Sequence, residues 1–126
     1  MPHAARVERP EKSGVGVRGE EEAAQYYLDR GYRVLERNWR CRLGEIDLVL
    51  LKGDTVVLCE VKTRRGSAFG GPHEAVTWKK QRKLRQLGEA FLAASGARAA
   101  ELRFDVASVT IPPSGDVSLH IFEDAF

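Results

Sequence analysis

The chain has 126 residues, of which 43% are hydrophobic and 30% are charged, as expected for one globular domain with a modest core. No apolar run approaches the roughly 18 residues that cross a membrane, and the N-terminus lacks the apolar stretch of a secretory signal. Cys41 and Cys59 are too few for a disulfide scaffold and lack the paired spacing of a zinc site. We therefore expect a cytoplasmic protein with no membrane partner.

The net charge of +2 conceals a strongly basic middle region. Between residues 62 and 103 there are ten Lys or Arg and three Glu, whereas the last fifteen residues carry three acids and no Lys or Arg. A local basic field of this kind attracts polyanions such as nucleic acid. The alternative is a solvated helix face whose charges only keep the protein soluble.

The chain begins with an expected arm and helix. Residues 1–13 are polar, contain two prolines and show no periodicity, so we expect a disordered arm before a single domain over 14–126. Apolar side chains then recur three and four residues apart and predict a helix over about 18–30. Gly31 stands where the cap of its C-terminus belongs.

Three strands are expected next. Weak alternation of apolar side chains predicts a short strand over 32–37, and two stronger strands follow over 44–51 and 55–62. The short connection 52–54 contains a glycine, so the two stronger strands should pair as an antiparallel hairpin.

The second half predicts one longer helix and two strands. Residues 66–72 form a glycine-rich loop without the Lys-Ser/Thr ending of a phosphate-binding loop. A helix is expected over about 74–95, and strands over 102–111 and 117–122 with a turn at 112–115. The order α-β-β-β-α-β-β predicts an α/β domain with a mixed central sheet and helices packed against it.

The chemically most informative residues are Asp47, Glu60 and Lys62, on the two strands of the predicted hairpin. Glu60 and Lys62 are two residues apart and share one face of their strand. Each strand therefore places an acid among apolar positions, which is costly unless the acid is paired. A divalent cation removes this cost, and oxygen ligands suit Mg²⁺ or Mn²⁺. The alternative is an ordinary ion pair between Glu60 and Lys62 on an exposed sheet face.

These residues also resemble a known superfamily. Gly44-Glu45-Ile46-Asp47 followed by Glu60-Val61-Lys62-Thr63-Arg64 resembles the PD-(D/E)xK nucleases, and more closely the YraN-type family of uncharacterised bacterial proteins, which is related to archaeal Holliday junction resolvases. Ile46 replaces the proline of the superfamily's name, as it does in YraN-type proteins. The further matching pieces are Gly19-Glu20 with Ala23, Gly31-Tyr32, Asn38, Phe69-Gly70, Lys80 and Arg103-Phe104-Asp105-Val106.

The resemblance implies a restriction-endonuclease-like or resolvase-like fold and assigns roles to four residues. Asp47 and Glu60 match the metal ligands, and Lys62 matches the lysine that orients water and stabilises charge. Glu20 matches a helix acid that helps to hold metal or water. For Glu20 and its neighbours Glu21 and Glu22, the alternative is that acids in a first helical turn favour the helix dipole. Glu45 shares the face of Asp47 and is interpreted as a rim residue.

Basic residues near these acids are candidate nucleic-acid contacts. Five of the seven residues from 79 to 85 are Lys or Arg, and Lys80 interrupts an otherwise apolar stripe, so it should point toward the sheet. The alternative for Lys80 is a stem lying along the core edge with its charge in water. Contacts to phosphates position a nucleic acid without reading its sequence. The candidates are Arg64, Arg65, Lys79, Lys80, Arg82, Lys83 and Arg85.

Three aromatic residues and one acid have both a structural and a functional interpretation. Trp39, Phe69 and Trp78 each neighbour basic residues, so they are either buried rings or platforms for unpaired bases. His73 lies beside the glycine-rich loop as a residue at the edge of the site. Arg103 and Asp105 share a strand face and are expected to form a structural pair, with Asp105 a weaker site candidate.

Together these observations favour a Mg²⁺- or Mn²⁺-dependent endonuclease that hydrolyses phosphodiester bonds in DNA, including branched or flapped DNA. One alternative is a non-catalytic nucleic-acid-binding module that keeps the nuclease fold. Another is an interaction protein without a nucleic-acid role. Four-way junctions have two-fold symmetry, so a resolvase-like activity implies a homodimer.

Overall fold

A computed structural model describes residues 14–66 and 78–125. The expected arm over 1–13, Phe69, His73 and the first residues of the expected helix over 74–95 lie outside the described residues. The elements follow the predicted order. They are α1 (Gly14–Asp29), β1 (Arg33–Cys41), β2 (Gly44–Lys52), β3 (Thr55–Arg65), α2 (Trp78–Ser95), β4 (Glu101–Ile111) and β5 (Ser118–Phe122).

The five strands form one open mixed sheet in the order β1-β2-β3-β4-β5. β1 with β2, β2 with β3, and β4 with β5 are antiparallel, whereas β3 and β4 are parallel. Parallel neighbours need a crossover connection, and α2 lies in the segment between these two strands. The mixed α/β architecture predicted from the sequence is confirmed.

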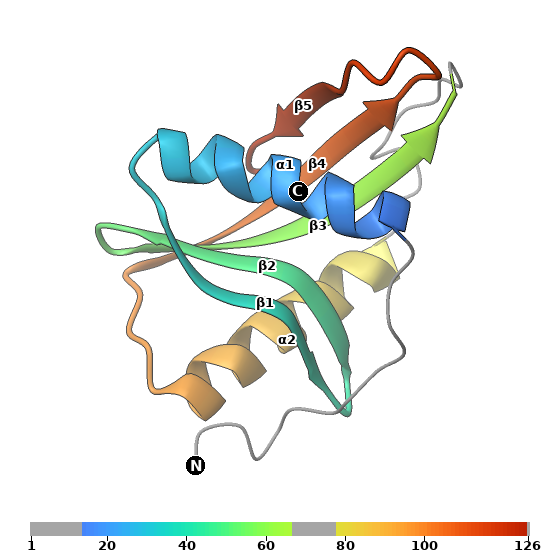
Figure 1. The fold of residues 1–126 in the computed structure, drawn as a ribbon. Helices are drawn as coiled ribbons and strands as arrows, with labels where there is room; N and C mark the ends of the chain where they lie inside the picture. The colour runs from blue at the N-terminus through green and yellow to red at the C-terminus, as the bar shows by residue number, and fades with distance from the viewer. Residues whose placement is uncertain (1–13, 67–77, 126) are drawn as a thin grey trace.

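The two helices lie on opposite faces of the sheet (Figure 1). Ala23, Ala24 and Tyr27 of α1 pack on one face against side chains that include Leu50 and Cys59. Leu87 and Phe91 of α2 pack on the other face. Around Leu87 and Phe91 lie Trp39, Ile46, Val49, Val56, Leu58 and Phe104.

Helix α1 ends as the sequence predicts but begins earlier. Gly31 has φ +88°, its N–H donates to Leu28 O at 3.1 Å, and the Tyr32 N–H donates to Tyr27 O at 3.0 Å. This is the Schellman pattern that glycine permits. Because the helix begins at Gly14, its first turn contains no acid. The helix-dipole interpretation of Glu20 and its two neighbours is therefore wrong.

Strands β1 and β3 extend beyond the expected 32–37 and 55–62. The added part of β1, Asn-Trp-Arg-Cys, alternates polar and apolar residues but begins at Asn38, whose φ of +53° departs from strand geometry. Pairing of Trp39 with Ile46 nevertheless keeps it extended beside β2. β3 reaches Arg65 because β4 pairs alongside it to the end. In both cases a partner strand decides the length.

None of the helices in the described ranges is long and apolar enough to cross a bilayer.

Candidate functional site

The candidate site lies where the β2–β3 ladder ends. The antiparallel pairing runs from Lys52 opposite Thr55 to Leu48 opposite Cys59. The next two residues of this register are Asp47 and Glu60, the acids that the sequence singles out. The Val61 N–H donates to Asp47 Oδ2 at 2.8 Å. A backbone donor therefore fixes the Asp47 carboxylate at the end of the ladder.

A cavity of about 250 Å³ opens between this end of the hairpin and α2. Its charged part has two lysines of α2, Lys80 and Lys83, and four acids, which are Glu45, Asp47, Glu60 and Asp105. The remaining wall is apolar, so a ligand meets both charge and hydrocarbon here. Its apolar residues include Ile46, Leu58, Leu84, Leu87 and Phe104.

Two lysines flank the Glu60 carboxylate. Lys62 Nζ lies 3.6 Å and Lys80 Nζ 3.7 Å from Glu60 Oε2, and about a third of each side chain is exposed. The geometry confirms that Glu60 and Lys62 share a face and that Lys80 points toward the sheet. Partly exposed pairs of this kind contribute only about 0–1 kcal/mol to stability. The fold therefore does not depend on this charge cluster.

The donor set fits a hard divalent cation that also uses water and substrate oxygens. Asp47 and Glu60 offer carboxylate oxygens in one cavity. Mg²⁺ commonly binds through one or two carboxylates, with waters and phosphate oxygens as the other ligands. Within residues 14–66 and 78–125, no three His, Cys, Asp or Glu residues converge to hold a metal by themselves. The site suits a cation shared with a substrate better than a closed structural metal site.

Glu20 lies on the other side of the sheet, on α1. The adjacent Gly19 packs directly on Thr63 of β3, which is why a residue without a side chain stands there. Glu20 is 6% exposed, whereas Glu21 is exposed, so Glu20 is the acid that faces inward. The described lining of the cavity does not include Glu20. Its role at the metal stays a prediction.

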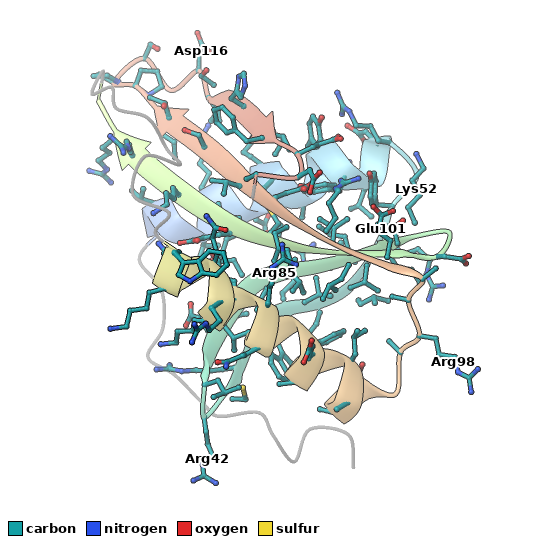
Figure 2. The ribbon with its side chains drawn as sticks, turned by 180° about the vertical axis from the view of Figure 1, so that it is seen from behind. Arg42, Lys52, Arg85, Arg98, Glu101 and Asp116 are labelled. Carbon is teal, nitrogen blue, oxygen red and sulfur yellow. The ribbon has the colours of Figure 1, made fainter. Side chains whose placement is uncertain are left out.

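The candidate phosphate contacts lie on two elements. Arg64 and Arg65 end β3, and Lys79, Arg82, Lys83 and Arg85 are exposed on the first turns of α2. Figure 2 views the molecule from the side of α2 and labels Arg85, whose guanidinium lies 5.3 Å from the centre of the Phe104 ring. Of the basic residues predicted from the sequence, Lys80 and Lys83 line the cavity.

Asp105 belongs to a structural network. It is 1% exposed and accepts hydrogen bonds from the Tyr27 hydroxyl at 2.6 Å and the Asp124 N–H at 3.0 Å. The Arg103 guanidinium donates to both its oxygens at 2.9 Å. This confirms the expected Arg103–Asp105 pair. The sequence did not reveal Tyr27 or Asp124 as partners, because both are distant along the chain and neither belongs to a motif.

The two tryptophans have opposite environments. Trp39 is 2% exposed, and its ring centre lies 5.4 Å from that of Phe91, so its interpretation as a buried ring is confirmed. Trp78 is 74% exposed at the start of α2, so burial is the wrong interpretation for this residue. Only packing distinguishes them, since both stand beside basic residues in the sequence.

The fold and site together define a class: a mixed α/β domain with a cleft that carries several carboxylates and two lysines. The family model described as "Uncharacterised protein family UPF0102" matches residues 19–109, and the chain belongs to that family. This agrees with the resemblance to an uncharacterised bacterial family.

The UPF0102 relatives match almost end to end. A UPF0102 protein of Rhodococcus jostii is 43% identical over 112 residues, covering 89% of this chain and 95% of its own. One from Clavibacter michiganensis is 48% identical over 111 residues, covering 88% and 94%. One from Caldicellulosiruptor saccharolyticus is 40% identical over 116 residues, covering 91% and 98%.

Proposed function

We propose that this protein is a divalent-metal-dependent endonuclease that hydrolyses phosphodiester bonds in DNA, with branched and flapped DNA among its substrates. The supporting observation is the convergence of Asp47 and Glu60 in one cavity, with Lys62 and Lys80 flanking Glu60. The proposal includes membership of the PD-(D/E)xK superfamily, a resolvase-like form of the mixed sheet, and a homodimer on two-fold symmetric junctions.

Asp47 and Glu60 would hold Mg²⁺ or Mn²⁺, with Glu20 as the predicted further acid. The ion would supply neutralisation of a phosphate oxygen and activation of water. Asp47 keeps its orientation through the Val61 N–H, so the site is organised before substrate arrives. Lys62 would orient the attacking water and stabilise the charge that develops on the phosphate oxygens. The basic side chains of β3 and α2 would hold the flanking phosphates.

A non-catalytic nucleic-acid-binding module is the second candidate function. The basic border of the cavity supports it as well as it supports an enzyme. The acid pair favours the enzyme, because two carboxylates facing a DNA backbone repel it unless a cation lies between them.

Cleavage of a labelled panel of single-stranded, duplex, flapped and four-way-junction DNA, and of RNA, tests the proposal. We expect products with Mg²⁺ or Mn²⁺ and none with EDTA. Asp47→Asn should reduce the cleavage rate by at least about 100-fold, since it removes a ligand charge from the metal and phosphate site. Asparagine retains an oxygen that can accept the Val61 N–H, so the variant should fold.

Asp54→Asn is the matched control. Asp54 is exposed in the turn at the closed end of the same hairpin, and asparagine is favoured in turns. This variant should cleave as the wild type does. Absence of cleavage by folded wild-type protein across the panel would leave the binding module as the function. Equal cleavage by wild type and Asp47→Asn would contradict the assigned site.

A further inference from the structure

Trp78 is an exposed aromatic ring in a basic setting. It is 74% exposed, whereas the other large exposed hydrophobic residues in the described part of the chain are the aliphatic Val17, Leu28 and Leu43. Isolated exposed apolar side chains are common and need no explanation. Trp78 differs because it begins α2, the helix whose first turns carry five Lys or Arg.

The ring and the acid pair lie on opposite sides of the first turn of α2. Lys80 Nζ is 3.7 Å from Glu60 Oε2, so the sheet-facing side of this turn is held against the carboxylate cluster. Trp78 is two residues earlier, about 3 Å along the helix axis and about 200° around it. A strand that contacts both must therefore pass around the first turn of α2.

Helical spacing gives the ring a cationic neighbour. Trp78 and Arg82 are four residues apart, so they share the face of α2 opposite the stripe that packs on the sheet. Arg82 is exposed, whereas the guanidinium of Arg85 lies over the ring of Phe104. An aromatic platform in line with a cation suits a single nucleic-acid strand, since a base stacks on the ring while a phosphate contacts the cation.

We propose that Trp78 stacks on an unpaired base of a DNA strand that runs from the Asp47–Glu60 cluster around the first turn of α2. This inference rests on the proposed nuclease function and narrows its substrate to DNA with unpaired nucleotides beside the cleavage site: single strands, flaps and junction branches. Paired bases in a continuous duplex have their faces covered by neighbouring base pairs, so they cannot stack on this ring.

Tryptophan fluorescence tests the proposal with Mg²⁺ present in proteins that all carry Asp47→Asn, so that a cation is available and binding is measured without cleavage. The protein that keeps Trp78 in this background serves as wild type. Of the two tryptophans, Trp39 is buried, so Trp78 is the residue that should respond to DNA. A single-stranded oligonucleotide should quench the emission. An abasic strand of the same length, or a duplex, should not. Trp78→Phe should bind the single strand within about threefold of wild type but lose the quenching, because phenylalanine keeps an aromatic face.

Trp78→Ala should bind the single strand about tenfold more weakly, as loss of one base–aromatic stack predicts, while its affinity for the abasic strand stays unchanged. Val17→Ala, on the exposed side of α1, is the matched control and should bind both strands as wild type does. Melting followed by circular dichroism would verify the fold of each variant. If Trp78→Ala binds the normal strand as tightly as wild type, the inference fails.

The outcomes separate this inference from the nuclease proposal. Metal-dependent cleavage that is lost in Asp47→Asn, with no effect of Trp78→Ala on binding, overturns the stacking and leaves the nuclease. A second outcome is quenching of the Trp78 emission by the single strand, weaker binding by Trp78→Ala, and no cleavage with any metal. This outcome overturns the nuclease proposal and supports stacking within a binding module. No binding of any DNA overturns both.

Discussion

At the scale of single residues, the best-defined polar interaction in the protein is structural. Asp105 is buried, and its two oxygens accept bonds from Tyr27, Arg103 and the Asp124 backbone. The network joins α1, β4 and the chain after β5. Asp47 and Asp105 both line the cavity and both accept a backbone N–H, but Asp105 also accepts hydrogen bonds from the side chains of Tyr27 and Arg103. The identity of the acid alone does not reveal this difference, whereas its side-chain donors do.

Tyr27→Phe should destabilise the protein by about 1–3 kcal/mol, because it leaves the buried Asp105 carboxylate without one donor. Burial also raises the pKa of the Tyr27 hydroxyl above its ordinary value of 10.0. A pKa that is raised in the folded state contributes stability below the unfolded value and loses it at higher pH. The wild type should therefore lose stability as pH rises above about 10, at up to about 1.4 kcal/mol per pH unit from this group.

Urea unfolding at several pH values from 8 to 11 measures both effects. Burial also raises the pKa of the Cys59 thiol, and this thiol interacts with Tyr27, so both proteins are compared in a Cys59→Ala background. The difference between wild type and Tyr27→Phe should therefore shrink above pH 10. A constant difference across this range would show that Tyr27 does not resist ionisation in the folded protein.

At the scale of elements, close approach of α1 to the sheet determines where its acid lies. A Cβ on Gly19 would overlap the Thr63 side chain, lying 2.9 Å from Thr63 Cβ in addition to a closer contact with the Thr63 hydroxyl. Gly19 thus makes a contact with β3 that only glycine allows, and the next residue, Glu20, is the acid that faces inward. The helix packs at this spacing because the small residues Ala23 and Ala24 continue the same surface.

Gly19→Ala should lower the free energy of unfolding by about 1–3 kcal/mol, as overpacking does. The sign is informative, because Gly to Ala in a helix otherwise stabilises by up to about 1 kcal/mol. Gly14→Ala is the matched control: it lies in the same helix with nothing within 4 Å of the added atom, and should be neutral or stabilising. Thermal and urea unfolding give both values.

A second substitution isolates the contact. Thr63→Ala removes the side chain that the new methyl group meets, so the double variant should recover much of the stability lost in Gly19→Ala. If the stability changes of Gly19→Ala and Thr63→Ala simply add in the double variant, the close approach of α1 to β3 is not the cause of the loss in Gly19→Ala.

At the scale of the whole molecule, five basic residues gather on the first turns of α2, beside the cleft. Lys80 and Lys83 line the cavity of the acid pair, whereas Arg98 projects from the chain after α2, at the other end of that helix (Figure 2). A DNA strand at the cleft would therefore displace counterions mainly through one group of side chains. The net charge of +2 does not reveal this, because acids elsewhere offset the local excess.

DNA affinity should fall steeply with salt, and Arg82→Ala should make the slope of log affinity against log salt shallower by about one ion. Arg98→Ala removes the same charge at an exposed position away from the cleft, so it should leave the slope nearly unchanged. Anisotropy titrations of a labelled strand at several salt concentrations measure both slopes. Equal slopes for the two variants would mean that only the net charge matters.

Much of this protein is determined by local sequence. Helical spacing predicts both helices, Gly31 predicts the end of α1, and alternation with a short connection predicts the β2–β3 hairpin that brings Asp47 and Glu60 together. Spacing also predicts that Lys62 shares the face of Glu60 and that Lys80 points toward the sheet. These features depend on residues close along the chain, whose geometry follows from backbone periods of 3.6 and 2.

The tertiary structure decided what depends on distant partners. β2 holds the end of β1 extended beyond Asn38, and β4 extends β3. Trp39 meets Phe91 in the core while Trp78 meets solvent, although both are tryptophans beside basic residues. The early start of α1 places Glu20 beyond the first turn and buries it. Burial and exposure follow from which segments pack together, and local periodicity carries no information about that choice.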